Sequence, residues 1–424
     1  WEGRRMFARG EINYEEFMEM VSASAPSVGH CNTMGTATSM NSLAEALGMS
    51  LTGCAAIPAP YSERAQMAYD TGLRSVQLVE KDIKPSDIMT REAFQNAIVT
   101  ASAIGASTNA PPHIIAIAKH LNINLTLDDW EKWGEEIPLL VNLQPAGDHL
   151  GEGFFQAGGV PVVMKELSKQ NKINNDAMTV TGKTVADNLA NIKKTENEII
   201  KNYEAPMKDK AGFLVLRSNF FDTAIMKMSV VSEEFKKRYL SDNEHPMQFT
   251  ARAIVFDGPE HYHNEINNPK LNIDENCILI IRGCGPIGYP GSAEVVNMQP
   301  PDHLLKKGIS TLPCLGDGRQ SGTSESASIL NVSPEAAAGG KIAIIKNNDL
   351  VKVDLIEKRV DVMIDQSTID ERMQKIQFKF PANQTPWQEI ARNYVGQLSD
   401  GACLNTKEEY FDVSKTKGVP RDNH

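Results

Sequence analysis

The pattern of apolar residues changes near the middle of this sequence, and that change constrains the fold more than any other feature. In the first half, helical periodicities alternate with short apolar runs, which is typical of an α/β domain. A polar segment rich in Lys and Asn follows at residues 193–210, and most apolar runs beyond it are short and β-like. Because 424 residues exceed one typical core, we predict an α/β domain over residues 1–205 and a β-rich domain over residues 206–424.

Local signals predict individual elements in both halves. Strands are expected in the apolar runs at residues 139–142, 213–216, 251–256, 277–281, 342–345, 351–355 and 360–364. Helices are expected to begin near residues 36, 110, 126, 161 and 385. The last of these has Thr385 and Gln388 at the spacing of a capping box, with Pro386 at the first helical position.

Charge and cysteine usage exclude several classes of function. The formal net charge is −11 and is spread without long blocks of one sign, which argues against binding to nucleic acid or to an anionic membrane. No apolar run reaches the length of a membrane span, and no signal peptide opens the chain. Six scattered cysteines without a CxxC pair do not resemble a disulfide framework, so we expect a cytoplasmic protein. An organellar targeting segment stays open, because the sequence does not begin with Met.

Cys31 lies in the run GHCNTMGTATSM, directly before a short amphipathic helix that Gly48 ends and that Thr36 or Thr38 can cap. The apolar face of that helix consists of Met40, Leu43, Ala44 and Leu47. A cysteine near a helix N-terminus lies beside unpaired N–H groups, which favours the thiolate that ligates iron or zinc or acts as a nucleophile. The alternative is a buried apolar cysteine. For His30 and His113 two roles likewise stay open: each could line an active site or make structural hydrogen bonds.

Two loops in the second half carry further candidates. The run Gly283–Gly288 matches GxGxxG, but Pro286 and Pro290 obstruct the helix that a dinucleotide site requires. These glycines instead predict a tight loop whose backbone approaches a ligand. Ser321, in DGRQSGTS, is by its residues alone a hydroxyl in a turn among glycines. The GxSxG motif of hydrolases is absent from the sequence.

Several long segments together resemble the dihydroxy-acid dehydratase / 6-phosphogluconate dehydratase family. They are VGHCNTMGTATSMNSLAEALGMSLTGCAAIPAPYSERAQMAY (28–69), STNAPPHIIAIAKH (107–120), PLLVNLQPAGDHLGEGFFQAGGVP (138–161), IRGCGPIGYPGSAEVVNM (281–298) and LGDGRQSGTSESASILNVSPEAA (315–337). The resemblance spans nearly the whole chain and is greatest to the branch that dehydrates pentonic sugar acids, L-arabinonate and D-xylonate. It implies an α/β domain followed by a swivelling β-barrel-like α+β domain that resembles that of aconitase.

The resemblance also implies roles for particular residues. Cys31 matches a cysteine ligand of an iron–sulfur cluster, 2Fe–2S in preference to 4Fe–4S, and Glu294 matches a ligand of Mg²⁺, which prefers carboxylate oxygen. Ser321 matches the catalytic base and Thr323 a residue that binds substrate. A serine becomes a base for a C–H proton only where cations stabilise its alkoxide. Cys284 and Cys314 match no ligand and are expected to pack in the interior, and Glu325 departs from the small residue usual in relatives.

The implied reaction removes water from a small polyhydroxy carboxylic acid to give a 2-keto-3-deoxy acid, and a homo-oligomer (a dimer or tetramer) is expected. Two alternatives stay open. One is the dihydroxy-acid dehydratase of branched-chain amino-acid synthesis, and the other is an inactive, truncated remnant of the family. The second alternative arises because the family carries a further N-terminal segment with two cluster cysteines, an aspartate and a carbamylated lysine. The sequence begins within the region that follows that segment, so this chain alone is expected to be incomplete and inactive.

Overall fold

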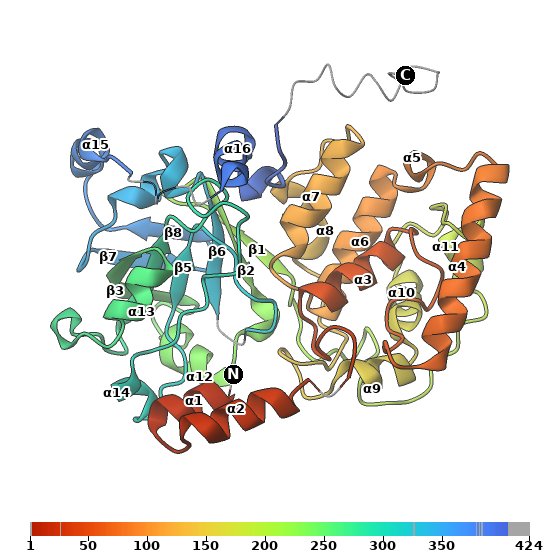
Figure 1. The fold of residues 1–424 in the computed structure, drawn as a ribbon, viewed down its shortest axis with the longest axis horizontal. Coiled ribbons are helices and arrows are strands. Elements are labelled where there is room, and N and C mark those ends of the chain that lie inside the picture. The colour runs from red at the N-terminus through yellow and green to blue at the C-terminus, as the bar shows by residue number, and fades with distance from the viewer. Residues whose placement is uncertain are drawn as a thin grey trace.

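The computed structural model describes residues 2–25, 27–324, 327–378, 380, 382 and 385–405. Figure 1 shows a helical half beside a half built around one sheet, with the first two helices lying under the sheet half. Those two helices are α1 (Glu2–Arg9) and α2 (Tyr14–Ala23). The helical half contains α3 (Thr36–Ala46), α4 (Ser62–Glu80), α5 (Pro85–Ile88), α6 (Arg91–Ile104), α7 (Ala110–His120), α8 (Leu127–Gly134), α9 (Gly151–Gln156), α10 (Gly159–Lys169) and α11 (Val185–Leu189).

Helix α6 is the centre of the helical half. All of its residues from Ala93 to Ile104 except Gln95 are buried, and α3, α7, α8 and α10 pack around it. A helix that is buried on nearly every side in this way belongs in the interior of a domain. It ends at Gly105, whose φ of 61° is a left-handed conformation that glycine adopts without a steric penalty.

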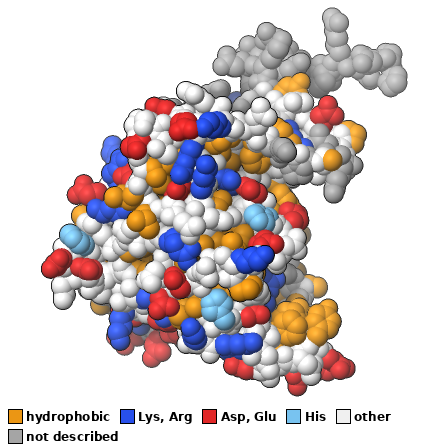
Figure 2. Space-filling model, turned by 90° about the vertical axis from the view of Figure 1, so that its left-hand side faces the viewer, with side chains coloured by type: hydrophobic (Ala, Val, Ile, Leu, Met, Phe, Trp, Pro, Cys, Tyr) orange, Lys and Arg blue, Asp and Glu red, His pale blue; other side chains and the backbone are white. Residues whose placement is uncertain are grey.

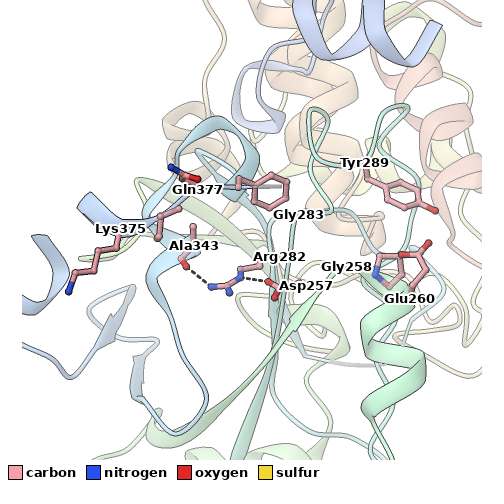
Figure 3. A pocket seen from close by; sticks show the side chains of 12 residues that line it. Asp257, Gly258, Glu260, Arg282, Gly283, Tyr289, Ala343, Lys375 and Gln377 are labelled. Atoms are coloured by element: carbon pink, nitrogen blue, oxygen red, sulfur yellow. Dashed lines mark hydrogen bonds and ion pairs between the residues drawn. The ribbon is translucent and has the colours of Figure 1, made fainter. Parts of the chain in front are cut away.

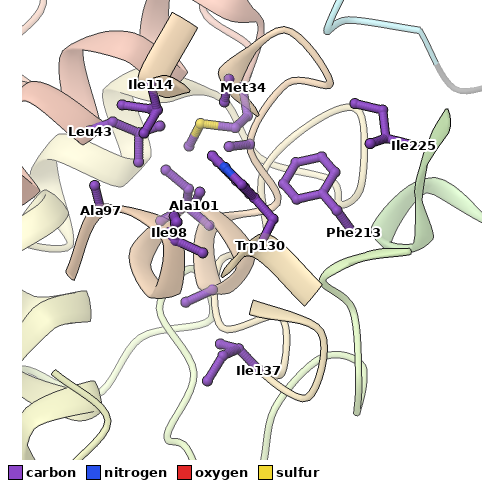
Figure 4. Packing of buried hydrophobic residues seen from close by; sticks show 14 of the residues in the cluster. Met34, Leu43, Ala97, Ile98, Ala101, Ile114, Trp130, Ile137, Phe213 and Ile225 are labelled. Atoms are coloured by element: carbon purple, nitrogen blue, oxygen red, sulfur yellow. The ribbon is translucent and has the colours of Figure 1, made fainter. Parts of the chain in front are cut away.

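The core of the helical half continues onto the sheet. The fully buried Trp130 of α8 packs edge-on against Phe213 at a centroid distance of 5.5 Å. Figure 4 shows the indole between that ring and the α6 side chains of Ile98 and Ala101. Edge-on aromatic pairs add to the free energy gained by burying apolar area. The contact between Trp130 and Phe213 therefore stabilises the packing of the helical half against the sheet.

The second half is built on one eight-stranded sheet of order β1-β2-β6-β5-β4-β3-β7-β8. Its strands are β1 (Phe213–Leu216), β2 (Thr223–Lys227), β3 (Gln248–Asp257), β4 (Cys277–Arg282), β5 (Cys314–Gly316), β6 (Ser328–Ser333), β7 (Leu350–Asp354) and β8 (Arg359–Val362). Strands β3 to β6 are mutually parallel, and the remaining pairs are antiparallel. A bridge between Arg217 and Arg359 joins the two outer strands, so the sheet is nearly closed into a barrel.

Both faces of the sheet are covered. In β4, Cys277, Leu279 and Ile281 face the core shared with the helices, while Ile278 and Ile280 face the interior of the barrel. This alternation follows from the two-residue period of a strand, and a strand buried on both faces is apolar throughout. The helices of this half are α12 (Glu233–Phe235), α13 (Pro259–Glu265), α14 (Asp302–Leu305), α15 (Gln366–Lys375) and α16 (Pro386–Tyr394).

The mixed α/β composition and the barrel-like sheet agree with the expected fold class. The expected strands in the second half overlap β1, β3, β4, β7 and β8, apart from the one at residues 342–345. The capping box of Thr385 and Gln388 is present at the start of α16. The boundary at residue 205 and the likeness to aconitase stay predictions.

Three local predictions were wrong. Residues 139–142 make isolated bridges to Lys208 and Ile200 rather than a strand. Lys341–Ile344 form a 3-10 helix, since a short apolar run does not distinguish a strand from a buried helical turn. Neither Thr36 nor Thr38 caps α3, because Gly35 occupies the N-cap position and the hydroxyl of Thr38 donates to the carbonyl of Thr33.

Candidate active site

The four predicted site residues come from the two halves of the chain and meet at the N-terminus of α3. Gly35 lies between two of them: a Cβ built there would be 3.6 Å from Sγ of Cys31 and 3.1 Å from Cγ2 of Thr323. A Cβ at Gly322 would lie 2.5 Å from Cβ of Ser107 and 3.1 Å from the backbone N of Thr36. Both glycines therefore permit a close approach that a side chain would prevent.

Ser321 is held in place by its backbone and by its neighbour in the turn. Its N–H donates to Oδ1 of Asn297 over 3.1 Å. Its Oγ lies 2.8 Å from Oγ1 of Thr323 and accepts a longer hydrogen bond, 3.4 Å, from the N–H of Thr323. The two donors that can face this oxygen would stabilise negative charge on it, which a serine base requires.

The carboxylate of Glu294 lies between the same two halves. Its Oε1 accepts a hydrogen bond from the hydroxyl of Thr36 at 3.1 Å and a second from the amide of Asn109. Asn297 donates to its backbone carbonyl over 2.6 Å, so Glu294 and Ser321 share one partner. The sequence reasoning missed Asn109 and Asn297. The sequence signal at Asn109 is its place in STNAPPH, which predicts only the start of a helix.

A buried carboxylate, that of Asp317, contacts the glycine loop at residues 283–288 and lies shortly before the turn that contains Ser321. Asp317 is fully buried and accepts hydrogen bonds from the N–H groups of Gly283, Cys284 and Ala336 at 2.8 to 2.9 Å. Burial raises the pKa of Asp317, and the three N–H donors oppose that rise. The loop after β4 thus directs its N–H groups at a carboxylate of the protein itself. No helix begins within residues 283–298, as expected for a tight loop rather than a dinucleotide site.

The two histidines have different surroundings. Arg319 donates to Nε2 of His113 over 3.4 Å and to the carbonyl of Ser292 over 2.6 Å, so His113 on α7 contacts the segment that precedes Ser321. Burial, and then the positive charge of Arg319, lower the pKa of His113, which keeps its ring neutral and able to accept. His30 is exposed, interacts with Thr38, and lines a cavity of about 360 Å³.

Of the six cysteines, Cys31 is exposed, Cys54 and Cys403 are partly buried, and the other three lie in the core. Cys31 is exposed, with Sγ 3.3 Å from Oγ1 of Thr33, so the alternative of a buried apolar cysteine is wrong. Cys284 and Cys314 are buried as expected, and burial raises the pKa of Cys314 to about 12.

The described residues do not complete a metal site. No group of three or more His, Cys, Asp or Glu side chains among them could hold a metal ion. Cys31 and Glu294 supply one thiolate and one carboxylate, which is too few for either an iron–sulfur cluster or a magnesium ion. Glu325 lies outside the described residues.

A second cavity, of about 440 Å³, lies at the carboxyl ends of β3 and β4 (Figure 3). Arg282 projects into this cavity. Its guanidinium forms an ion pair with Asp257, with Nε 2.6 Å from Oδ1, and donates hydrogen bonds to the carbonyl oxygens of Ala343 and Ile345. None of the four predicted site residues lines it. The chemistry predicted from the sequence therefore lies elsewhere, at the junction of the halves.

Charged side chains of both signs lie on the surface of the described residues. On the face shown in Figure 2, acidic and basic side chains are interspersed rather than gathered by sign. None of the helices in the described part of the chain has both the length and the apolarity of a membrane span.

Comparison with known proteins shows the class of protein to which this fold and site belong. The model of the dihydroxy-acid/6-phosphogluconate dehydratase N-terminal domain matches residues 1–188, and that of the C-terminal domain matches residues 198–402. The chain therefore belongs to the dihydroxy-acid/6-phosphogluconate dehydratase family, whose members are enzymes that eliminate water.

Individual relatives match this chain over all or nearly all of its length. It is 56% identical to the D-xylonate dehydratase of Caulobacter vibrioides over 424 residues, which is 100% of this chain and 71% of that protein. It is 40% identical to the L-arabinonate dehydratase of Rhizobium leguminosarum, again over 100% of this chain and 71% of the relative. A dihydroxy-acid dehydratase of Acetivibrio thermocellus is 38% identical over 95% of this chain and 70% of its own length.

Proposed function

We propose that the protein dehydrates a pentonic sugar acid of the D-xylonate or L-arabinonate type to its 2-keto-3-deoxy acid. The observation that carries this proposal is the meeting of Ser321, Thr323, Glu294 and Cys31 at one junction, although they come from both halves of the chain. The higher identity to the D-xylonate dehydratase than to the dihydroxy-acid dehydratase, 56% against 38%, supports a sugar acid as substrate.

In this proposal Ser321 is the general base. Its Oγ, as the alkoxide, takes the proton from C2 of the substrate, the C–H electron pair forms a double bond between C2 and C3, and the C3 hydroxyl leaves as water with a proton from solvent. The resulting enol takes a proton at C3, loses the proton of its C2 hydroxyl to solvent and becomes the 2-keto acid. Thr323 contributes an N–H and a hydroxyl beside Ser321 Oγ, which stabilise the alkoxide before it takes the proton.

The proposal includes two metal groups, an iron–sulfur cluster and Mg²⁺, and the described residues offer one ligand to each. Cys31 would be one ligand of an iron–sulfur cluster, with 2Fe–2S favoured, and Glu294 one ligand of Mg²⁺. Such groups supply positive charge that assists a leaving hydroxyl and lowers the pKa of nearby oxygen acids. Because the described residues offer one ligand to each group, the steps above are written through Ser321 and Thr323 alone.

A substrate panel on the protein expressed from its complete gene tests the proposed reaction. Turnover of D-xylonate or L-arabinonate, with negligible turnover of 2,3-dihydroxyisovalerate, is expected. The reverse preference would favour the dihydroxy-acid dehydratase alternative, to which the 38% identical relative points. Absence of turnover with every acid would favour an inactive member of the family.

Replacing the proposed base tests the mechanism. Ser321→Ala should lower turnover by about a hundredfold to ten-thousandfold, the usual contribution of a positioned base. The variant should also stop the loss of deuterium from substrate labelled at C2. Ser333→Ala, which removes a buried hydroxyl that donates to the carbonyl of Asn331 on β6, is the control and should keep its activity. If Ser321→Ala still exchanged the C2 label at the wild-type rate, the base would be another residue.

A further inference from the structure

Asn109 joins three segments that meet at the candidate site. Its side chain is fully buried, and its Nδ2 lies 2.8 Å from Oγ1 of Thr36 and 3.1 Å from the carbonyl oxygen of Gln320. The same Nδ2 also donates to Oε1 of Glu294. One amide group therefore contacts the first residue of α3, the carboxylate assigned to Mg²⁺, and the residue directly before Ser321.

The orientation of this amide follows from its neighbours. The carboxylate of Glu294 and the carbonyl of Gln320 can only accept hydrogen bonds, so the NH₂ group must face them. The reverse orientation would place Oδ1 against two acceptors. The bond to Glu294 is part-buried, and because its acceptor is a carboxylate it is charge-assisted and stronger than a bond between neutral groups.

The side chain of Asn109 is not held by the helix that it precedes. Asn109 is the N-cap residue of α7, but the second and third helical residues are Pro111 and Pro112, which have no N–H for its side chain to accept. It makes no cap bond, and among the described residues its Oδ1 has no partner. The amide therefore serves the contacts with Thr36, Glu294 and Gln320 rather than the helix end.

We propose that Asn109 is a positioning residue that holds the Glu294 carboxylate and the backbone before Ser321 in one fixed relation across the two halves of the chain. This inference rests on the proposed function for the roles of Glu294 and Ser321. Without the amide, Glu294 loses a strong donor and the Ser321 turn loses its tie to α7. Divalent-cation binding and turnover number should both fall, and KM for the sugar acid should change less.

Two substitutions separate the role of the amide from that of the side-chain volume. Asn109→Leu keeps the approximate volume and removes the amide. Asn109→Ser also removes the amide and leaves a small polar side chain, which cannot cap α7 because Pro111 and Pro112 have no N–H. If only the filled volume mattered, the leucine variant would keep wild-type behaviour. If the amide positions Glu294 and Ser321, both variants should be impaired.

Asn96 supplies the matched control. It is also a fully buried asparagine, on α6, and it exchanges hydrogen bonds with the backbone of Asn174 at 2.7 and 3.0 Å, away from the site. Asn96→Leu therefore removes an equally buried amide and should cost comparable stability. It should leave divalent binding and the exchange of the site loops as in the wild type.

The experiment uses the protein expressed from its complete gene, with Mn²⁺ binding followed by electron paramagnetic resonance and backbone hydrogen exchange followed by mass spectrometry. Both Asn109 variants should bind Mn²⁺ about tenfold to a hundredfold more weakly, the usual effect of removing a hydrogen bond behind a metal ligand. Exchange at residues 294–298 and 319–323 should become faster in both. Asn96→Leu should show neither change.

Wild-type behaviour in Asn109→Leu, or the same changes in Asn96→Leu, would overturn the inference. If the wild-type protein binds no Mn²⁺, backbone hydrogen exchange alone tests the inference. Faster exchange in both Asn109 variants supports the positioning role of Asn109, and unchanged exchange refutes it. Failure of the proposed function would be seen separately, as absence of sugar-acid turnover in the wild-type protein.

Discussion

Lys227 on β2 carries an amine in an apolar interior, and replacing it should stabilise the protein in a pH-dependent way. The side chain is 5% exposed, and its Nζ has no hydrogen-bond partner among the described residues. It lies on the same face of β2 as Ile225, which belongs to the core shared with the helices. Burial, and to a lesser extent the charge of Lys208, lower the pKa of Lys227 from 10.5 to about 7.

The size of the effect follows from that pKa. One pKa unit corresponds to about 1.36 kcal/mol, so a fall from 10.5 to about 7 means that the charged form costs up to about 5 kcal/mol in the folded state. Below about pH 7 the amine is charged in both the folded and the unfolded chain, and the full cost is present. Between about pH 7 and 10.5 only the unfolded chain is protonated, so the free energy of unfolding rises with pH. Above that window the cost is absent.

Urea unfolding of Lys227→Met and the wild type at about pH 6 and about pH 9.5 measures this directly. The methionine variant should be more stable at the lower pH by about 2 to 5 kcal/mol. Its advantage should shrink by about 3 kcal/mol at the higher pH. Lys307→Met replaces an exposed lysine and should change stability by less than about 0.5 kcal/mol at either pH. An advantage that is the same at both pH values, or no advantage at the lower one, would show that the Lys227 amine is not a buried, unpaired group.

Two further predictions concern the junction of the halves. In the protein expressed from its complete gene, Cys31→Ser should lose bound iron and visible absorbance, while Glu294→Gln should keep both. The reason is that a thiolate binds a soft metal and a carboxylate binds a hard cation. Iron retained in the cysteine variant would contradict the assignment of Cys31 as a cluster ligand. Gly322→Ala should cost about 1 to 3 kcal/mol in urea unfolding, since its Cβ would lie 2.5 Å from that of Ser107. Gly72→Ala, in an open position on α4, should instead be neutral or stabilising by up to about 1 kcal/mol, and equal losses in both would contradict the packing argument.

Much of the fold could be predicted because short-range rules govern it. The capping box at Thr385 and the apolar run of β4 are local patterns, and each formed the expected element. The helix before Gly48 formed as expected for the same reason, although its N-cap differs from the predicted one. The run at residues 342–345 was mistaken for a strand because apolar residues in a buried 3-10 turn and in a strand look alike over so short a length.

The sequence by itself determined which residue types were available for chemistry. Cys31, Glu294, Ser321 and Thr323 were recognised through motifs, and their proposed roles still rest on that resemblance. Only the tertiary structure decided that they lie together, because contacts between residues so far apart in the chain depend on how α3, α7 and the sheet loops pack. Asn109 shows the same limit most clearly. The sequence around Asn109 predicts only the start of a helix. Its amide reaches Glu294 and Gln320 because packing brings those acceptors to it.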